Sequence, residues 1–448
     1  MLNTELGITE FKLSLISEHA KRNKSMQFTS LAHLLNANFL KRCFWSLDRN
    51  KALGQDKVSW YDYRENLGEN IKSLVERLKR KSYRPIPSRR VYIPKENGKT
   101  RPLGISAIEN KIVERAIARI LEAIYEQDFS PTSFGFRPKR NCHQALKTIG
   151  DLITFRRINH VIEADIKGFF DNVSHEIMLK ALKIRIKDSS LLYLINKFLK
   201  AGYVSSGTMH RTEIGTPQGS ILSPILANIF LHYVLDEWFE YTVKKYTRGF
   251  CELVRYADDF IIVTNQKSDA EKIEQVLYKR FKRYGLELHP EKTKRISFGA
   301  YERINAKTQH RKANTFDFLG FTHYCGKTRK GKFKVGRKTS KKKFAKACKE
   351  MNNWLRETRN RSKTKHWWKI LVSKLRGHYQ YYGVSENSKG ITNYYHHTTR
   401  MIHKWLNRRS QKRKMNWKQF KDYLTHYPIP KPKIKVSFYT NNPMLYVR

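Results

Sequence analysis

The sequence predicts an α+β protein in which strand pairs alternate with amphipathic helices. Two stretches are typical of strand, tight turn and strand: residues 83–105, which contain the turn sequence E-N-G-K, and residues 253–263, which read L-V-R-Y-A-D-D-F-I-I-V. Apolar residues at helical spacing predict a long helix over residues 107–125, and residues 340–427 show similar helical patterning. A length of 448 residues suggests two or three domains.

The remaining elements follow from shorter patterns. Residues 31–47 and 71–81 predict helices near the N-terminus. Residues 161–173, V-I-E-A-D-I-K-G-F-F-D-N-V, form an apolar run that predicts a strand. A Gly/Pro loop then leads into an apolar helix over residues 225–238, and a further helix is expected over residues 269–284.

The chain carries a large positive charge. It has 89 Lys and Arg residues against 39 Asp and Glu, a formal net charge of +50. A charge of this size opposes compaction unless a polyanion accompanies it, and nucleic acid is the natural candidate, with salt-dependent binding. A membrane surface is the competing interpretation, but the sequence has no apolar run of 18 or more residues and no lipidation motif, so we expect no membrane partner.

Cysteine usage and the N-terminus indicate the compartment. The cysteines are odd in number, far apart and without C-x-x-C spacing, so we expect reduced thiols and neither a disulfide framework nor a zinc site. They are Cys43, Cys142, Cys251, Cys325 and Cys348. The sequence begins M-L-N-T-E-L-G, which lacks the pattern of a secretory signal. We therefore expect a cytoplasmic protein of prokaryotic type, with an organelle origin left open.

A pair of adjacent aspartates, Asp258 and Asp259, lies between two apolar runs. Two like charges about 4 Å apart repel by roughly 4 kcal/mol at an effective dielectric near 20, and burial adds a desolvation cost. Arg255 is the only basic residue beside them. A divalent cation is the simplest compensation, and Mg²⁺ prefers one or two carboxylates together with substrate phosphates. Taken alone, the stretch is equally typical of an exposed turn in an ordinary hairpin.

Asp165 supplies a third carboxylate, in the middle of the strand predicted over residues 161–173. A polymerase palm needs one carboxylate from a strand and one or two from a neighbouring hairpin. Together these hold two metals about 4 Å apart, one for the attacking 3′-hydroxyl and one for the leaving pyrophosphate. Asp165, Asp258 and Asp259 provide that set. Between them lies the loop G-T-P-Q-G-S-I-L-S-P at residues 215–224.

In this order, D-I-K-G-F-F-D, G-T-P-Q-G-S-I-L-S-P and Y-A-D-D resemble a reverse transcriptase of the group II intron type. The string L-R-G-H-Y-Q-Y-Y-G at residues 375–383 is similar to the maturase-specific thumb of group II intron proteins. The resemblance implies a right-hand polymerase with fingers, a palm with an antiparallel sheet and a helical thumb. It also implies dNTP substrates, an RNA template, intron RNA, a DNA primer or target, and two Mg²⁺ ions, for which Mn²⁺ is a possible substitute. No obligate protein partner is evident.

The resemblance also implies roles for individual residues of the catalytic site. The catalytic residues and metal ligands are expected to be Asp165, Asp258 and Asp259, and Ile166 is expected to contact both metal and nucleotide. Residues 161–173 also contain Asp171, which we expect to cap a helix that starts near Ser174, the alternative being that it binds metal.

The nucleotide site is expected to contain Lys95, Arg101, Phe170 and Gln218. Lys95 and Arg101, on the hairpin of residues 83–105, would contact the triphosphate, where a planar guanidinium suits the γ-phosphate. Phe170 would clash with a 2′-hydroxyl and so select deoxynucleotides, and Gln218 would face the incoming nucleotide and the template. The alternatives are an exposed basic hairpin that touches backbone phosphates, a core phenylalanine paired with Phe169, and a plain loop before a helix.

Nucleic-acid contacts are expected from Arg137, Lys292, Lys294, Arg376 and Tyr379. For Arg137 a structural salt bridge is an equally good interpretation. For the aromatic residues of the C-terminal helical region, the alternative is the core of a three-helix bundle.

The predicted domains follow these motifs. They are an N-terminal extension with the first fingers block (1–80), fingers (81–160), palm (161–335), a helical thumb (336–430) and a basic C-terminal tail (431–448). Residues 327–349 carry twelve Lys or Arg and no acid, and this shift in composition marks the boundary between palm and thumb. No H-N-H pattern with cysteine pairs is present, so we expect no endonuclease domain.

The resemblance thus implies RNA-directed DNA synthesis together with binding of intron RNA as a maturase. One alternative is a splicing factor that binds RNA on an inactive polymerase fold, although such a factor has no need for three clustered carboxylates. Another is a domesticated reverse transcriptase that acts in host defence or repair. An RNA-directed RNA polymerase would share the palm but would not be expected to keep an aromatic residue at Phe170.

Overall fold

The computed structural model describes residues 2–94, 100–361, 363–409 and 414–439, and the chain divides into two compact units. Unit 1 consists of Met1–Asn141, Ala164–Ile262 and Ser268–Lys294. Unit 2 consists of Cys142–Glu163, Val263–Lys267 and Arg295–Arg448. The mixture of helices and antiparallel strand pairs confirms the predicted α+β class.

The first part of unit 1 is built around helix α5 (Ile108–Tyr125), which confirms the helix predicted over residues 107–125. Its apolar positions recur every three or four residues and are fully buried, as the periodicity requires. Helices α1 and α2 pack against it. The other helical elements in this part of the chain are α1 (Leu2–Arg22), the 3₁₀ turn η1 (Ala32–Leu34), α2 (Ala37–Trp45), α3 (Trp60–Glu65) and α4 (Leu67–Lys79).

Beside these helices lies a four-stranded sheet in the order β2-β1-β4-β5. Strands β1 (Ser88–Pro94) and β2 (Thr100–Ile105) are antiparallel and pair Ile93 with Arg101, which confirms the predicted strand pair. The predicted turn E-N-G-K and Lys95 lie outside the described residues. Strands β4 (Tyr203–Ser205) and β5 (Thr208–His210) complete the sheet, after helices α8 (His175–Arg185) and α9 (Ser189–Leu199).

The Asp pair belongs to a second sheet, in the order β6-β7-β3-β8. Strands β6 (Cys251–Tyr256) and β7 (Asp259–Thr264) confirm the predicted strand, turn and strand, and their apolar side chains are buried. The other strands are β3 (His160–Ala164) and β8 (Lys294–Ser297), and the division between the units passes through β3 and β7. Asp165 directly follows β3, and helix α7 (Phe169–Asn172) comes after it.

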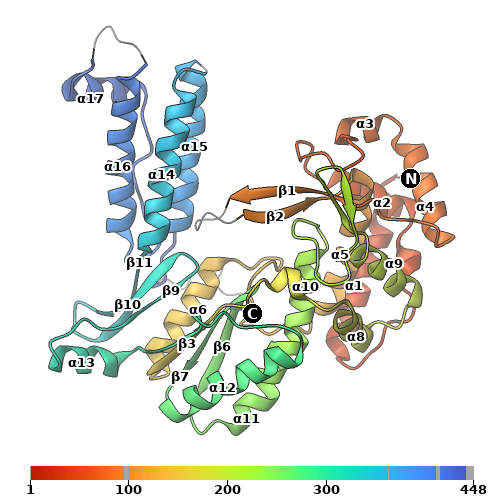
Figure 1. Ribbon diagram of the computed structural model, residues 1–448, viewed down its shortest axis with the longest axis horizontal. Coiled ribbons are helices and arrows are strands. Elements are labelled where there is room, and N and C mark those ends of the chain that lie inside the picture. Colours follow the sequence, from red (N-terminus) through yellow and green to blue (C-terminus); the bar gives the residue numbers. More distant parts are fainter. Residues whose placement is uncertain (1, 95–99, 362, 410–413, 440–448) are drawn as a thin grey trace. The chain divides into compact units, whose positions relative to one another are not determined.

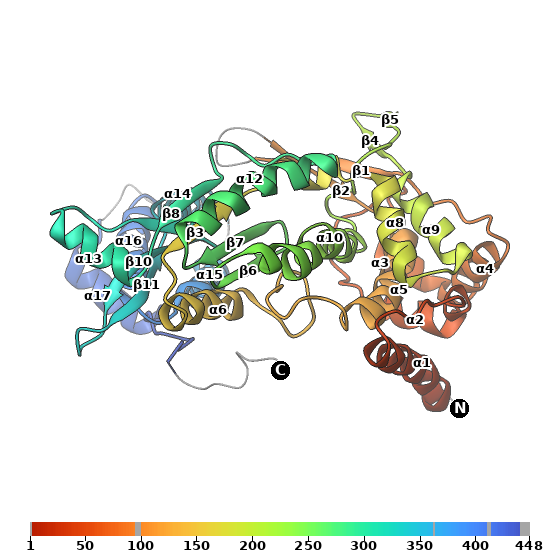
Figure 2. The same cartoon turned by 90° about the horizontal axis from the view of Figure 1, so that it is seen from below.

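The helix predicted over residues 225–238 differs from the structure in its winding. Helix α10 (Ser223–Leu231) is α-helical, but the chain then continues as two π-helical segments, η2 (His232–Asp236) and η3 (Phe239–Val243), before a short α11 (Lys244–Tyr246). Figure 2 shows α10 beside β6 within unit 1. Helix α12 (Lys267–Arg283) follows β7, close to the predicted range of 269–284.

Unit 2 contains a three-stranded antiparallel sheet in the order β11-β10-β9. Its strands are β9 (Thr315–Phe318), β10 (Phe321–Lys327) and β11 (Phe333–Thr339), and the unit also holds helices α6 (Cys142–Phe155) and α13 (Ala300–Thr308). The fully buried Asn387, which directly precedes the helix of residues 388–406, links this helix to strand β11 through hydrogen bonds. Its Oδ1 accepts from the N–H of Thr339 at 2.9 Å, and its Nδ2 donates to the hydroxyl of Thr339 at 2.8 Å.

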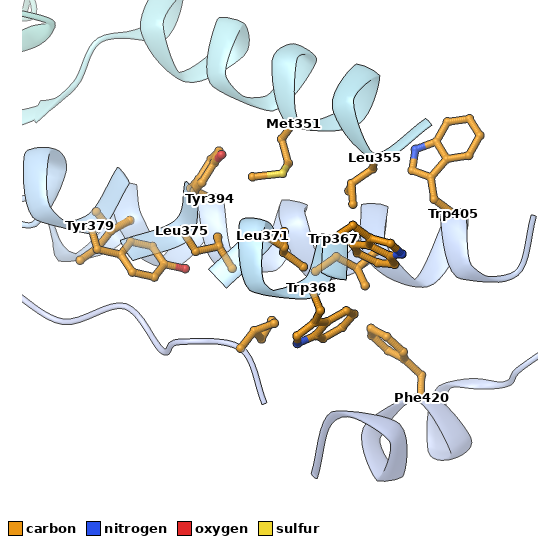
Figure 3. Packing of buried hydrophobic residues seen from close by; sticks show 13 residues of the cluster. Met351, Leu355, Trp367, Trp368, Leu371, Leu375, Tyr379, Tyr394, Trp405 and Phe420 are labelled. Carbon is orange, nitrogen blue, oxygen red and sulfur yellow. The ribbon is translucent and has the colours of Figure 1, made fainter. Parts of the chain in front are cut away.

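The helical region predicted over residues 340–427 is confirmed as α14 (Lys341–Thr358), α15 (Thr364–Tyr382), α16 (Ser388–Leu406) and α17 (Trp417–His426). The first three are long helices that lie side by side (Figure 1). Their facing sides form one apolar core (Figure 3). Trp367, Trp368 and Tyr379 are all within this core. These residues lie in the core of the helical bundle, which was the alternative to a role in nucleic-acid contact.

Among the described residues, no helix has both the length and the apolar character that crossing a bilayer would require.

His378 makes the helical bundle sensitive to acid. Its ring stacks on Tyr394, with 3.6 Å between the ring centroids, and burial lowers its pKa from 6.5 to about 4. Between these two pH values His378 is protonated in the unfolded chain but neutral in the folded bundle. The free energy of unfolding therefore falls as the pH falls through this window.

The substitution His378→Phe keeps an aromatic ring in the stack. We therefore predict that the free energy of unfolding of this variant falls less on acidification than that of wild type, by on the order of 2 kcal/mol. Thermal melts between about pH 7 and pH 4 measure this effect. The matched control is His396→Phe, at an exposed position of α16, which should retain the wild-type dependence on pH. An equal slope in wild type and His378→Phe would contradict the assignment.

Candidate active site

The Asp pair is presented by the turn between β6 and β7. Ala257 and Asp258 form the turn, and Asp259 is the first residue of β7. Ala257 has a φ of +58°, in the left-handed region that residues other than glycine rarely adopt. A short parallel bridge joins Ser133 to Arg255 at the end of β6 and anchors the strand beside the turn. The Asp258 side chain is partly covered, whereas Asp259 is exposed.

Asp258 has a raised pKa. The largest cause is burial, which removes hydration from the charged carboxylate, and the negative charge of Asp165 raises the pKa further. The positive charges of Arg101 and Arg255 act in the opposite direction. Asp165 therefore lies within electrostatic range of Asp258, and the metal site expected to be shared by the two residues stays a prediction.

Asp165 is fixed by the segment that precedes β8. Its backbone carbonyl accepts from the N–H of His289 at 2.8 Å, and its Oδ2 accepts from the Nζ of Lys292 at 2.5 Å. The Lys292 ammonium thus neutralises one of the two interacting carboxylates. Lys294, two residues further on, is exposed at the start of β8. The phosphate contacts expected of both lysines stay a prediction.

Ile166 is almost fully buried and bridges to Leu288 on the main chain. The aliphatic side chain of Ile166 has no atom that can bind a metal. The predicted metal contact would therefore have to come from the main-chain carbonyl of Ile166. Phe170 is 9% exposed and packs edge-to-face on Phe169, with 5.2 Å between the ring centroids. Phe170 also lines a cavity of about 390 Å³ together with Gln218. It is therefore both a core residue paired with Phe169 and a residue beside a pocket.

A chain of polar contacts links β2 and α7 to the loop that contains Gln218. The exposed Arg101 of β2 donates from Nε to the Oε1 of Gln218 at 2.9 Å. Gln218 donates from Nε2 to the Oδ1 of Asp171 at 3.3 Å. On the main chain, the N–H of Gly104 donates to the carbonyl of Gln218 at 2.6 Å. Arg101, Gln218 and Asp171 therefore form one edge of the 390 Å³ cavity or lie beside it.

The prediction that Asp171 caps the next helix is wrong. Ser174 caps α8 itself, because its hydroxyl accepts from the N–H of Ile177 at 3.3 Å. Asp171 belongs to the preceding short helix α7 and binds Gln218 instead. The sequence carries no signal for this contact, because the two residues are 47 positions apart.

Two residues that were expected to bind nucleic acid are buried. Arg137 is 7% exposed, and its guanidinium binds the carboxylate of Glu126 at 3.0 Å and two backbone carbonyls at 2.7 Å. This arrangement is the structural salt bridge that was the alternative. Tyr379 is 2% exposed, within the bundle core of unit 2. Neither side chain is available to a phosphate in this structure, whereas Arg376 of α15 is exposed.

The donor chemistry of the Asp pair and Asp165 fits a divalent cation. Carboxylate oxygens are the ligands that Mg²⁺ and Mn²⁺ prefer, and Asp258 is destabilised in its charged form both by burial and by Asp165. Within the described residues, no three His, Cys, Asp or Glu side chains are gathered closely enough to hold a metal. The Lys292 ammonium provides the compensating charge at Asp165 instead.

Comparison with known proteins connects this site to a family. Residues 93–323 match the family described as reverse transcriptase (RNA-dependent DNA polymerase), and this range is more than half of the 448-residue chain. It contains strand β2, the β6–β7 pair, the three aspartates and the loop with Gln218.

Individual proteins are similar over parts of this range. The chain is 41% identical over 239 residues to the group II intron-encoded protein LtrA of Lactococcus lactis subsp. cremoris, which covers 53% of this chain and 39% of that protein. It is 39% identical over 199 residues to protein YkfC of Escherichia coli K12, covering 44% and 51%. An uncharacterized 91 kDa protein in a cob intron of Schizosaccharomyces pombe is 43% identical over 170 residues, covering 38% and 21%.

The matched segments span about half the length of these relatives or less. The match to the family, by contrast, covers most of the described part of unit 1 that carries the aspartates. By this match, and with the three motifs in their expected order, the chain belongs to the reverse transcriptase (RNA-dependent DNA polymerase) family.

Proposed function

We propose that this protein is an RNA-directed DNA polymerase of the group II intron type, which copies an RNA template into DNA from dNTPs. The observation that carries the proposal is that Asp165 lies within electrostatic range of Asp258, in a unit whose 390 Å³ cavity is lined by Phe170 and Gln218. Membership of the reverse transcriptase family supports it, as does the similarity to an intron-encoded protein.

In this proposal, two Mg²⁺ ions are held by Asp165, Asp258 and Asp259 with the carbonyl of Ile166, and Mn²⁺ can substitute. When bound, such ions lower the pKa of a primer 3′-hydroxyl and offset the charge of a departing pyrophosphate. Asp165 and Asp258 lie within electrostatic range of each other, and the Lys292 ammonium on Asp165 would have to give way to a bound metal. The support for this arrangement is the raised pKa of Asp258, which a divalent cation would relieve.

The remaining residues act on the nucleotide. Arg101 is exposed beside Gln218, and its positive charge already acts on Asp258, which suits a contact with the triphosphate of a nucleotide bound there. Phe170 packs firmly against Phe169, so its ring resists displacement by a 2′-hydroxyl. Gln218, held between Arg101 and Asp171, is placed to contact the base or sugar. Lys95 is assigned to the triphosphate by resemblance alone.

The same protein is proposed to bind intron RNA as a maturase that assists splicing. The net charge of +50 and the exposed cations Lys292, Lys294 and Arg376 support contact with RNA and with a DNA primer or target. The helices α14–α17 and the string L-R-G-H-Y-Q-Y-Y-G on α15 support the assignment of a thumb. All five cysteines are free thiols, in keeping with a cytoplasmic location.

The first test is primer extension on an RNA template with Mg²⁺ and dNTPs. Asp258→Asn keeps the shape of the side chain but removes its charge, so it should abolish extension while RNA binding persists. The matched control is Asp422→Asn, at an exposed position of α17, which should extend the primer normally. Equal extension by wild type and Asp258→Asn would refute the assignment of the site.

The second test addresses the selection of deoxynucleotides. Removing the ring in Phe170→Ala opens space beside the cavity, so incorporation of ribonucleotides should rise relative to deoxynucleotides. Competition between dNTPs and rNTPs in single-nucleotide extension measures the ratio. Phe155→Ala, at a 76% exposed position, is the control for loss of a phenylalanine side chain. An unchanged ratio in Phe170→Ala would remove Phe170 from this role.

The third test concerns the ion pair between Lys292 and Asp165. Because the ammonium occupies the oxygen that a metal requires, Lys292→Met should bind Mn²⁺ more tightly in the absence of nucleic acid. The Lys292 side chain is exposed and Asp165 is partly covered, and ion pairs open to solvent contribute at most about 1 kcal/mol, so the gain should not exceed about fivefold. Lys294→Met is the control. Weaker Mn²⁺ binding by Lys292→Met would contradict competition between lysine and metal.

A further inference from the structure

Arg255 is the last but one residue of β6, two positions before the turn residue Ala257, and its side chain is fully buried. A buried guanidinium is tolerated only when its donors are paired. Its Nε and Nη2 donate to the two carboxylate oxygens of Asp236 at 2.8 and 2.5 Å. Its Nη1 donates to the Oδ1 of Asn228 at 2.9 Å and to the carbonyl of Ala257 at 3.0 Å. The last contact joins the buried group to the catalytic turn.

The contact falls on a residue that needs support. Ala257 has the left-handed φ of +58°, which an alanine adopts only when its surroundings hold it there. Gly135 packs directly on the turn, and a Cβ at Gly135 would lie 2.2 Å from the nitrogen of Ala257. Asn228 donates from Nδ2 to the carbonyl of Gly135 at 2.8 Å. Arg255, Ala257, Gly135 and Asn228 therefore close a ring of contacts around the turn.

The π-helical segment brings the two partners of Arg255 onto one face. In an α-helix, positions eight residues apart are rotated by about 80° relative to each other, so Asn228 and Asp236 would point in different directions. The segment η2 (His232–Asp236) winds more slowly and reduces this rotation. Both side chains then reach the same guanidinium. Single π-turns inside helices are frequent at functional sites.

We propose that Arg255, held by Asp236 and Asn228, is a positioning residue that fixes the Ala257–Asp258 turn and so keeps the Asp258 carboxylate oriented toward the metal site. This inference rests on the proposed polymerase function. Arg255 itself contacts neither substrate nor metal. The competing explanation is an ordinary buried ion pair that contributes only to folding.

The electrostatics of the turn indicate why such a device is required. Burial and the charge of Asp165 both disfavour the charged form of Asp258, so a flexible turn would relieve the repulsion by turning the carboxylate away. The positive charge of Arg255 counteracts this repulsion less than that of Arg101 does. The contact by which Arg255 acts on the turn itself is its hydrogen bond to the Ala257 carbonyl at 3.0 Å.

The test uses Arg255→Lys, which keeps the positive charge but loses the planar fork that binds Asp236, Asn228 and Ala257 together. Its matched control is Arg185→Lys. Arg185 is an equally buried arginine of the same unit, paired with Asp128 and remote in sequence from the catalytic motifs. Melting curves establish that both variants fold and lose similar stability.

We expect Arg255→Lys to lower kcat for primer extension by about ten- to a hundredfold, with the KM for dNTP little changed, because a misplaced catalytic group costs this much. It should also weaken Mn²⁺ binding in the absence of nucleic acid. Arg185→Lys should alter neither value. Wild-type kcat and wild-type Mn²⁺ affinity in Arg255→Lys, at matched stability, would overturn the proposal.

A second substitution examines the left-handed residue itself. Glycine adopts a positive φ without strain, so Ala257→Gly in the Arg255→Lys background should recover several-fold of the lost kcat and Mn²⁺ affinity. An ordinary buried ion pair gives no reason for such a rescue, and its absence would overturn the proposal. If wild type binds Mn²⁺ in an Arg255-dependent way but extends no primer, the proposed function fails while the positioning role stands.

Discussion

The repulsion between the carboxylates of Asp165 and Asp258 is the constraint on which the rest of unit 1 depends. Burial and the charge of Asp165 both oppose ionisation of Asp258, and the positive charges of Arg101 and Arg255 offset this only in part, since the pKa of Asp258 stays raised. Each of the two aspartates is therefore held by contacts with residues from other segments of the chain. Asp165 is fixed by His289 and Lys292, and Asp258 is fixed through the buried group at Arg255. Binding of a divalent cation at Asp165 would then have to displace the Lys292 ammonium.

The same constraint explains why distant segments converge on the turn. The loop with Gln218 is bound to β2 through Gly104 and to α7 through Asp171. The helix that follows this loop carries Asn228, which binds Arg255 of β6 and the carbonyl of Gly135. Motifs that lie far apart in the sequence are thus joined by hydrogen bonds between neutral and charged polar groups. Their order in the chain reflects how they are connected in space.

Much of the fold could be predicted because its signals are local. The apolar period of α5, the alternating runs of β6 and β7 and the helical pattern of α14–α17 are each contained within a few turns or a single hairpin. The fold implied by the resemblance, a right-hand polymerase, is the fold of the family to which the chain belongs. The role of the three aspartates was inferred from carboxylates in and beside apolar runs, and it stays a prediction.

The errors share a physical cause, which is that sequence does not show what a polar side chain faces. Arg137 and Tyr379 have the chemistry of nucleic-acid ligands but are buried against Glu126 and in the bundle core. Arg255 was noted only as a charge beside the Asp pair, whereas it binds Asp236, 19 residues earlier. The π-helical winding was missed because residues 225–232 are all buried. Without an exposed polar face, the sequence pattern does not show how many residues make up each turn.

That winding has a consequence for aligning relatives. Positions seven apart in an α-helix share a face to within about 20°, so a homologue with a regular helix needs one residue fewer between its equivalents of Asn228 and Asp236. A one-residue gap at this place in an alignment would then mark a change of winding, with the buried pair retained. Forcing the two sequences into ungapped register would match Asp236 to the wrong side of the neighbour's helix.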